Sequence, residues 1–418
     1  MADIQPFTGV LYDTARVNPA DVLTQPYDKI NNEMRERYLK QSPYNLIRIE
    51  LGKEEPGDSD SSNKYTRAAA LFQQWLKDGA LRRSAQPALY WLEQTFQAPG
   101  STVTQTRKGL IARVRLHRWD EVVVLPHEHT LSKPKADRMS LLKTVGAQQG
   151  QIFMLHPDPI PVPKLGKPLY ELVDDYSVTN KVYEITDPAS IKAIQSGIAQ
   201  QNLYIADGHH RYETALAYRD EMAAGPDAPS AFVMATIVDM NDPGLVVLPT
   251  HRTVTNLQWF DRKHFQTLLA QHFTVEPQPT WEALAAAMKT APHLIGMADA
   301  EQYALLRPKN LDALKPLFAG KPALWETLDV AILHVAILEA LLNIDEVRLR
   351  EESNVAYWRE PAEALKLIRR GAAQLAFFLS PTPVGDVKAV ADARSKMPQK
   401  STDFYPKLLS GMVMYEVR

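Results

Sequence analysis

The chain contains no cysteine among its 418 residues. Disulfide bonds, zinc sites made of thiolates and cysteine nucleophiles are therefore all excluded. Any metal ion that binds this protein has to use histidine, aspartate or glutamate side chains.

Long apolar runs are also missing. The nearest candidate, residues 330–342, is too short to span a bilayer and contains His334 and Glu339. The first residues, MADIQPFTGVLYD, lack the basic segment and the apolar stretch of a secretory signal. We therefore expect a cytoplasmic protein with no membrane partner.

The sequence has no excess of charge of either sign. Its 47 Lys and Arg residues balance 49 Asp and Glu residues, so no overall basic field favours nucleic acid as a partner. Hydrophobic residues make up 45% and charged residues 23%, which is typical of a folded globular protein. The length predicts two or three domains.

Three common motifs are absent as well. No G-x-x-x-x-G-K-[ST] run supports a P-loop ATPase, and no G-x-G-x-x-G follows an apolar run, so an NAD-binding Rossmann domain has no fingerprint. No G-x-S-x-G supports a hydrolase serine elbow. Nothing in the sequence indicates a haem or an iron–sulfur cluster.

The apolar patterns predict an α/β protein of the α+β type, with mixed sheets. We expect a domain boundary between residues 242 and 260, which separates an N-terminal α/β domain, 1–250, from a more helical domain, 251–418. A basic loop at 396–407 could return to the site. In the first domain we expect helices at 32–39, 64–79, 136–145 and 209–223, strands at 46–51, 122–125, 203–206, 231–239 and 246–248, and a hairpin of 88–96 with 108–116. In the second we expect helices at 281–289, 328–342 and 360–371, and strands at 374–379 and 412–416.

The densest polar group is Asp207-Gly208-His209-His210-Arg211, which follows an apolar run and opens a helical pattern. A strand that turns directly into a helix points the N–H groups of the first helical turn at whatever lies above the strand, and the helix dipole favours an anion there. Gly208 would let a phosphate approach the backbone, and the guanidinium of Arg211 would bind its oxygens. The pattern predicts a phosphate or nucleotide site.

The other residues of this group have candidate catalytic roles. Asp207 could bind a metal ion or accept a proton, and His209 and His210 could donate hydrogen bonds or relay a proton. The alternative is structural, because Asp is a common helix cap, Gly a common turn residue, and Arg211 could form a surface ion pair with Glu213 or Asp207. We favour the site because the five polar residues are contiguous and follow an apolar strand.

A second polar segment contains His127, Glu128 and His129. On an extended chain His127 and His129 point the same way and could chelate a metal ion, although the spacing is not that of H-E-x-x-H. A contact to phosphate or substrate through His127, Lys135 and Arg138 is the favoured alternative, because cations gather there. An ordinary polar loop is the third interpretation.

Further segments place cations and hydroxyl groups where an anion could bind. The basic loop 396–407 could fold over a phosphate, and two other segments carry polar residues after a proline. Each of them could instead be a solvated loop. The candidates are Tyr27, Asp28, His251, Arg252, Lys400 and Ser401.

Several separated motifs carry a family resemblance. They are VLPHEHTL, KADR, ADGHHRYETAL, MNDPGLVVLPTHR and MPQKSTDFYPKLLSG. Through them nearly the whole chain resembles the bacterial and archaeal family called domain of unknown function 1015. The D-G-H-H-R block is also distantly similar to the phosphate-binding motif of the ParB/sulfiredoxin superfamily, which includes free-serine kinases.

The superfamily resemblance implies a ParB/sulfiredoxin-like core. In it Gly208, His209, His210 and Arg211 would form a phosphate cradle, and Asp207 would be a catalytic or metal-linked carboxylate. It further implies that the acceptor is a small hydroxyl compound such as serine. The long C-terminal half departs from those kinases, and their acidic activating residue has no matching position here.

The sequence thus predicts a kinase-like phosphotransferase that binds Mg²⁺ and a nucleotide, ATP or ADP. Two alternatives stay open. One is a ParB-like nucleotide-sensing or DNA-associated regulator. The other is a metal-dependent hydrolase that uses His127, His129, His209 and His210.

Overall fold

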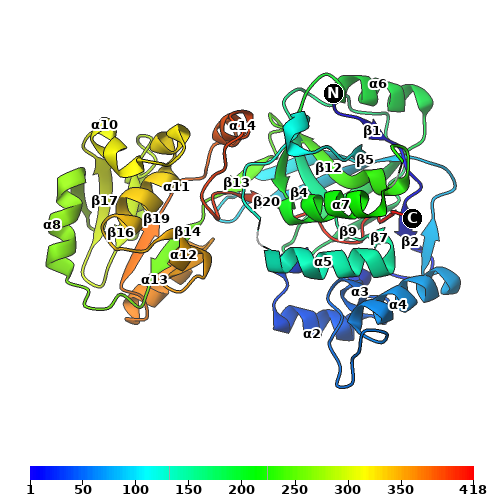
Figure 1. Cartoon of the computed structure of the whole chain (residues 1–418), viewed down its shortest axis with the longest axis horizontal. Helices are drawn as coiled ribbons and strands as arrows, with labels where there is room; N and C mark the ends of the chain where they lie inside the picture. Colours follow the sequence, from blue (N-terminus) through cyan, green and yellow to red (C-terminus); the bar gives the residue numbers. More distant parts are fainter. Residues whose placement is uncertain (131, 224) are drawn as a thin grey trace. The chain divides into compact units, whose positions relative to one another are not determined.

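The structure is a computed structural model that describes residues 1–130, 132–223 and 225–418, without the side chains of 132–134. The chain forms two compact units (Figure 1). Unit 1 comprises Met1–Pro126, Thr130–Val246 and Tyr405–Arg418, and unit 2 comprises His127–His129 and Val247–Phe404. The chain returns to unit 1 at its end, because β21 (Tyr415–Glu416) pairs with β7 (Ala147–Gln148). The division expected from the sequence instead assigned 251–418 to one domain.

Within the described residues, a nine-stranded mixed sheet forms the centre of unit 1, which agrees with the predicted α/β class. The strand order is β6-β11-β8-β12-β5-β4-β10-β9, and β1 pairs with β5. β6 with β11 and β8 with β12 run parallel, and the other pairs are antiparallel. The strands are β1 (Ile4–Gln5), β4 (Leu89–Gln97), β5 (Thr104–Arg115), β6 (Val124–Leu125), β8 (Ile152–His156), β9 (Tyr170–Val173), β10 (Thr179–Ile185), β11 (Leu203–Asp207) and β12 (Phe232–Asp239).

Helices cover this sheet, and α5 and α7 lie side by side (Figure 1). The apolar side chains of β5, β8, β11 and β12 share one buried cluster with residues of α6 and α7. The helices of unit 1 are α1 (Pro19–Val22), α2 (Asn32–Gln41), α3 (Ile47–Glu50), α4 (Lys64–Asp78), α5 (Ser132–Val145), α6 (Pro188–Ile198) and α7 (His209–Met222), and a small strand pair joins β2 (Val10–Tyr12) to β3 (Leu81–Arg83).

Local capping explains why the predicted helices start and stop where they do. Asn31 accepts a hydrogen bond from the Met34 backbone N at 2.9 Å and so caps α2. Asn63 and Thr66 form a reciprocal capping box at the start of α4. Gly79, with φ of 73°, ends α4 in the left-handed conformation. The predictions of these two helices and of the β4–β5 hairpin are confirmed.

One strand prediction is wrong. Residues 46–51 contain helix α3 instead of a strand, because the Asn45 side chain accepts from the Ile47 backbone N at 3.0 Å and starts a helical turn. A short apolar run alone does not distinguish a buried helix from a strand. β13 (Val246–Leu248) is a strand, but it is not part of the nine-stranded sheet. The expected strand at 412–416 is reduced to β21.

Unit 2 contains a six-stranded antiparallel sheet within the described residues, in the order β15-β17-β16-β19-β14-β18. The expected helix at 328–342 is a short α-helix followed by a π-helix, η6, which is apolar except for His334 and Glu339 and is buried almost throughout. The strands of this sheet are β14 (His251–Val254), β15 (Phe273–Gln278), β16 (Ile295–Ala298), β17 (Tyr303–Pro308), β18 (Val355–Trp358) and β19 (Leu375–Phe378), and the helices are α8 (Arg262–His272), α9 (Trp281–Ala287), α10 (Leu311–Leu314), α11 (Asp329–Ala331), η6 (Ile332–Glu339), α12 (Glu346–Arg350), α13 (Pro361–Arg369) and α14 (Val384–Asp392). The short β20 (Asp403–Tyr405) is not part of this sheet.

In the described part of the chain, none of the helices has both the length and the apolar character that crossing a bilayer requires.

Candidate functional site

The turn between β11 and α7 consists of Gly208 alone. β11 ends at Asp207 and α7 begins at His209. Gly208 has φ of 94°, a left-handed conformation that a residue with a side chain adopts only with strain. Gly208 is also the N-cap of α7 and provides no side-chain hydrogen bond to it. The positive end of the α7 dipole therefore lacks the usual side-chain cap.

The Arg211 side chain folds back toward this turn. Its Nη1 donates to the backbone O of Gln151. A Cβ on residue 208 would lie 3.1 Å from Nη2 and 3.2 Å from Nε of Arg211, so a glycine is needed where the guanidinium approaches. Nε and Nη2 make no hydrogen bond with any described residue, and this edge of the guanidinium can receive an oxyanion.

We expect Gly208→Ala to weaken the binding of inorganic phosphate or ADP at least about tenfold, because alanine strains the left-handed turn and pushes Arg211 away. Isothermal titration calorimetry measures this. Gly79→Ala is a matched control, since Gly79 has φ of 73° and a Cβ there would lie 3.2 Å from the guanidinium of Arg16. The control should lose stability and keep wild-type affinity. Wild-type affinity in Gly208→Ala would contradict the expected role of the turn.

Asp207 lies among cations. Its carboxylate accepts from Lys407 Nζ at 2.7 Å, with the two side chains 28% and 10% exposed. Burial by itself would raise the pKa of Asp207, but the charges of Lys407, Arg211 and Lys29 together hold this pKa far below its ordinary value. A carboxylate with so low a pKa is a weak base, which favours a positioning role over the predicted role as a proton acceptor.

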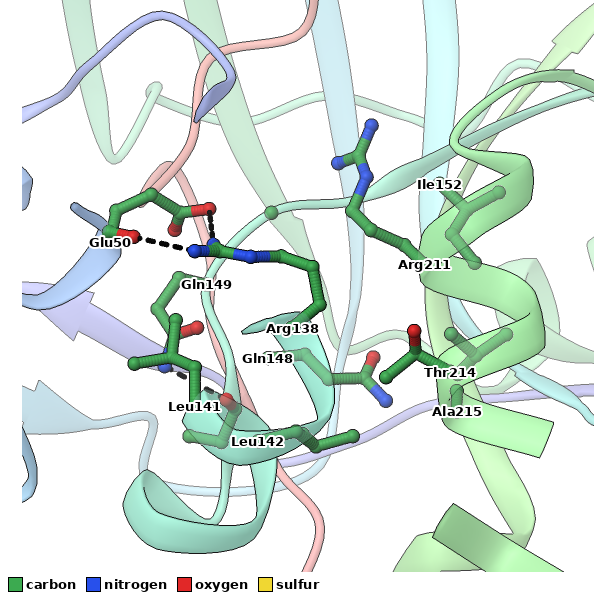
Figure 2. A pocket seen from close by; sticks show the side chains of 13 residues that line it. Glu50, Arg138, Leu141, Leu142, Gln148, Gln149, Ile152, Arg211, Thr214 and Ala215 are labelled. Carbon is green, nitrogen blue, oxygen red and sulfur yellow. Dashed lines mark hydrogen bonds and ion pairs between the residues drawn. The ribbon is translucent and has the colours of Figure 1, made fainter. Parts of the chain in front are cut away.

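A buried ion pair lies in the same pocket as Arg211 (Figure 2). Nη1 of Arg138 donates to Oε1 of Glu50 at 3.1 Å, and Nη2 donates to the Glu50 backbone O at 3.0 Å. The two side chains are 8% and 4% exposed. Oε2 of Glu50 is buried without a hydrogen-bond partner. Burial raises the pKa of Glu50, although Arg138 and Arg211 oppose the shift. Glu50 is therefore a stronger base than an ordinary carboxylate.

Tyr27 supports this ion pair. The guanidinium of Arg138 lies 4.4 Å from the centre of the Tyr27 ring, a cation–π contact. Nε of Arg138 also donates to Asp137 at 3.0 Å. Asp28, a sequence candidate beside Tyr27, is exposed. Tyr27 and Arg138 thus belong to one cluster with Glu50, and in the described part of the chain Asp28 makes no hydrogen bond or ion pair to these three residues.

The pocket in Figure 2 is small, with a volume of about 50 Å³. At about 10 to 15 Å³ for each water, it holds roughly four water molecules or a ligand group of similar size. Glu50, Arg138 and Arg211 provide its charged groups, and leucines 141 and 142 part of its apolar wall. A larger pocket of about 630 Å³ shares Glu50, Arg138 and Leu141 with it. The Arg138–Glu50 pair therefore lines both pockets.

The remaining sequence candidates of unit 1 contact neighbouring parts of helices α5 and α7. His209 is buried and His210 is half-buried at the start of α7, where the His210 backbone O accepts from Thr214 Oγ1 at 2.7 Å. Lys135 pairs with Glu213 at 2.8 Å and so ties α5 to α7. Lys135 was expected to contact a phosphate, but in the structure its charge is balanced by Glu213.

The other sequence candidates belong to unit 2. His127 is buried with its Nε2 3.1 Å from Thr402 Oγ1. Glu128 is half-buried, and His129 is exposed. The Ser401 hydroxyl donates to the Pro398 backbone O. The backbone O of the exposed Lys400 accepts a hydrogen bond from Nη2 of Arg252 at 2.9 Å. His251 precedes Arg252 on β14.

Within the described ranges, no group of three or more His, Asp or Glu side chains is arranged to hold a metal ion. His127 and His129 also have different surroundings, because one is buried and the other exposed. Chelation of a metal ion by His127 and His129, which the sequence favours less than a contact to phosphate, therefore has no geometric support.

Sequence reasoning missed two residues of the unit 1 site. Glu50 was overlooked because the segment around it was interpreted as a strand, although a glutamate between Ile49 and Leu51 in an apolar run was a visible signal. Lys407 stood in the basic loop and was not singled out. No local pattern connects it to Asp207, which is 200 residues earlier in the chain.

The chain matches one known protein family over most of its length. The family described as "Protein of unknown function (DUF1015)" matches residues 4–331. The chain belongs to this family. The resemblance drawn from the motifs is therefore confirmed, and the DUF1015 match includes every unit 1 site residue above except Lys407.

Solved structures provide distant matches to this DUF1015 protein. A conserved hypothetical protein from Pyrococcus furiosus has 14% identity and a TM-score of 0.35, with 71% of this chain and 90% of that chain covered. A free serine kinase in complex with AMP has 12% identity and a TM-score of 0.36, with 73% and 92% covered. SbnI from Staphylococcus aureus, truncated at its C-terminus, has 12% identity and a TM-score of 0.35, with 72% and 85% covered.

No curated protein matches the chain significantly.

Proposed function

We propose that this protein is a phosphate- or nucleotide-dependent enzyme of small molecules, a kinase-like phosphotransferase, with its phosphate site at residues 207–211. The observation that carries the proposal is the concentration of positive charge at the Gly208 turn. The charges of Arg211, Lys407 and Lys29 act together on the one carboxylate of Asp207. Cations gathered at a helix N-terminus favour the binding of an anion there.

The geometry of Arg211 supports phosphate as that anion. Its Nη1 is held by Gln151, and the Nε–Nη2 edge stays open beside a glycine. Two parallel N–H groups of a guanidinium match two oxygens of a phosphate. In this proposal Asp207 positions Lys407, and His209 or His210 donates to the phosphate or relays a proton.

Glu50 supplies the base in the proposed reaction. The acceptor hydroxyl oxygen attacks the terminal phosphorus of the nucleotide, the bond to the bridging oxygen breaks, and the nucleotide leaves one phosphate shorter. The hydroxyl proton passes to Oε2 of Glu50, which is buried without a partner and lines the same pocket as Arg211. Most of the rate enhancement would come from positioning and from neutralising charge.

Mg²⁺ is part of the proposal only as an ion carried by the nucleotide, where it would neutralise phosphate charge. Asp207 was the predicted ligand, but its carboxylate already accepts from Lys407. The ParB/sulfiredoxin-like core also remains a proposal, which the direct β11–Gly208–α7 connection supports. Serine as the acceptor rests on the resemblance to free-serine kinases alone.

We expect the wild-type chain to bind ADP or ATP and to transfer labelled phosphate to one member of a panel of small hydroxyl compounds that includes serine. Asp207→Asn should lower the turnover about 100-fold, because Lys407 loses its orientation, while nucleotide affinity falls less than tenfold. Calorimetry and a phosphate-transfer assay measure the two effects. A wild-type chain that binds neither nucleotide nor inorganic phosphate would contradict the proposal.

The stability of Asp207→Asn should depend on pH differently from that of the wild type. Because the folded-state pKa of Asp207 is depressed, its ionised form stabilises the fold above the unfolded pKa, about 4, and this stabilisation is lost as the pH falls toward the folded pKa. Acidification below about pH 4 should therefore destabilise the wild type more than Asp207→Asn.

A further inference from the structure

A guanidinium is buried in unit 2 without a counter-charge. Arg252 lies on β14, which is flanked by β18 and β19, and its side chain is 1% exposed. Nη1 donates to the backbone O of Thr250, and Nη2 donates to the backbone O of Lys400 at 2.9 Å. Nε is buried and has no hydrogen-bond partner. Every acceptor of Arg252 in the described structure is thus an uncharged carbonyl.

Carboxylates act on other arginines of this protein. The buried Arg138 faces Glu50, and the half-buried Arg359 in unit 2 donates through Nη2 to Asp403 at 2.8 Å. Arg107, which is as buried as Arg252, also donates only to uncharged oxygens and leaves Nη1 without a hydrogen bond, but the charges of Asp242 and Asp207 are within its range. Burial lowers the pKa of Arg252 to about 10, and no carboxylate acts to restore it. Arg252 is still cationic near neutral pH, so an uncompensated charge is buried in unit 2.

Two more buried polar atoms without a hydrogen bond belong to side chains near Arg252, and one of these side chains, Tyr357, has its ring centre 5.4 Å from the Arg252 guanidinium. Tyr357 is directly opposite Arg252 in the β14–β18 register, which places both side chains on the same face of the sheet. The Tyr357 hydroxyl and Nε2 of His334 are both buried without a hydrogen bond. Both side chains are within electrostatic range of the Arg252 charge. His334 is 5% exposed and belongs to the π-helix η6, a structure often found at functional sites.

His251 is not part of this group. It precedes Arg252 on the strand and therefore points to the opposite face of the sheet. There its ring lies 5.3 Å from the ring of Phe378, and its Nδ1 accepts from the Leu379 backbone N at 3.4 Å. Nε2 of His251 is also buried without a hydrogen bond, but it lies on the opposite face of the sheet from Arg252 and Tyr357.

We propose that unit 2 binds a small anion at Arg252, with the Tyr357 hydroxyl and His334 as its other contacts. The ligand is chloride or a single phosphate or carboxylate group. Ordered water could satisfy the three unpaired atoms, but water would leave the buried charge uncompensated, whereas an anion meets both requirements. This site lies in unit 2 and does not depend on the proposed phosphate site at residues 207–211.

The first test follows the Arg252 Nε–H directly by nuclear magnetic resonance. The full chain is labelled with ¹⁵N-arginine, dialysed to low salt and titrated separately with chloride, inorganic phosphate and acetate. We expect a saturable shift of the Arg252 Nε–H with at least one anion. The Nε–H of Arg262, which donates to Asp299 at 2.8 Å, should not shift and is the internal control.

Tight binding would leave the anion in place through dialysis, so its release on unfolding is measured as well. About one equivalent of a single anion per chain supports the proposal, and its identity distinguishes an inorganic ion from an organic ligand group. No shift in any titration together with no released anion overturns the proposal.

Variants provide a second measurement. Added anion should raise the melting temperature of the wild type and of Arg262→Met, and this rise should be absent in Arg252→Met. Arg211→Ala should keep the Arg252 response even if it loses nucleotide binding, which separates this site from the proposed phosphate site. If Arg252→Met does not fold, the titration and the release measurement on the wild type decide. An anion-dependent rise in Arg252→Met equal to that of the wild type would overturn the proposal.

Discussion

Arg138→Met is expected to lose about 3 to 5 kcal/mol of the free energy of unfolding. The substitution leaves the Glu50 carboxylate buried without its cation, and breaking a buried pair on one side costs this much because the remaining charge is uncompensated. The loss of the stacking contact on Tyr27 adds to the effect. Denaturant unfolding of the full chain measures it.

Two further variants test the cause of that loss. Adding Glu50→Gln to Arg138→Met should recover part of the stability, since neither charge then remains buried. Arg37→Met is the control, because Arg37 pairs with Asp175 at 2.6 Å with its own side chain 52% exposed. That surface pair should contribute no more than about 1 kcal/mol. Equal losses in Arg138→Met and Arg37→Met would show that the buried pair has no special role.

Arg211→Ala is expected to weaken the binding of inorganic phosphate and of ADP about 10- to 150-fold. This corresponds to roughly 1.5 to 3 kcal/mol, the contribution of a charged hydrogen bond. The open Nε–Nη2 edge beside Gly208 is the group that the variant removes. Calorimetry measures the affinity, and a melting curve checks that the fold survives the loss of the bond to Gln151.

Arg219→Ala is the matched control for this experiment. Arg219 also lies on α7, and its Nη1 also donates to a backbone carbonyl, that of Leu116, at 2.8 Å. The control should bind phosphate with wild-type affinity. If both variants bind as the wild type does, Arg211 is a structural residue and the proposed phosphate site is wrong.

Features that depend on near neighbours could be predicted from the sequence. The caps Asn31 and Asn63, the stop at Gly79 and the β4–β5 hairpin act over a few residues, and each is visible as a local pattern. The helical start at Asn45 was the exception. There the deciding hydrogen bond, from the Ile47 backbone N to the Asn45 side chain, lies inside an apolar run that fits either structure.

Some residues of the candidate site could likewise be found from the sequence, and others only from the fold. The Asp207–Arg211 segment is contiguous, so its composition was sufficient to single it out. Lys135 was expected to contact an anion, but its partner Glu213 lies on another helix, and only the packing of α5 against α7 revealed it. For the same reason the burial of Glu50 beside Arg138 could not be inferred from their positions, which are 88 residues apart.

By itself the sequence determined the family and the local helical and strand segments. It also determined a glycine turn that brings an arginine to a helix N-terminus. Only the tertiary structure decided which charges are paired and which are left over. Lys407 forms an ion pair with Asp207, one carboxylate oxygen of Glu50 is buried without a hydrogen bond, and Arg252 is buried without a carboxylate partner. The physical reason is that ionisation and pairing depend on burial and on distances across the fold, whereas turns and caps depend on the next few residues.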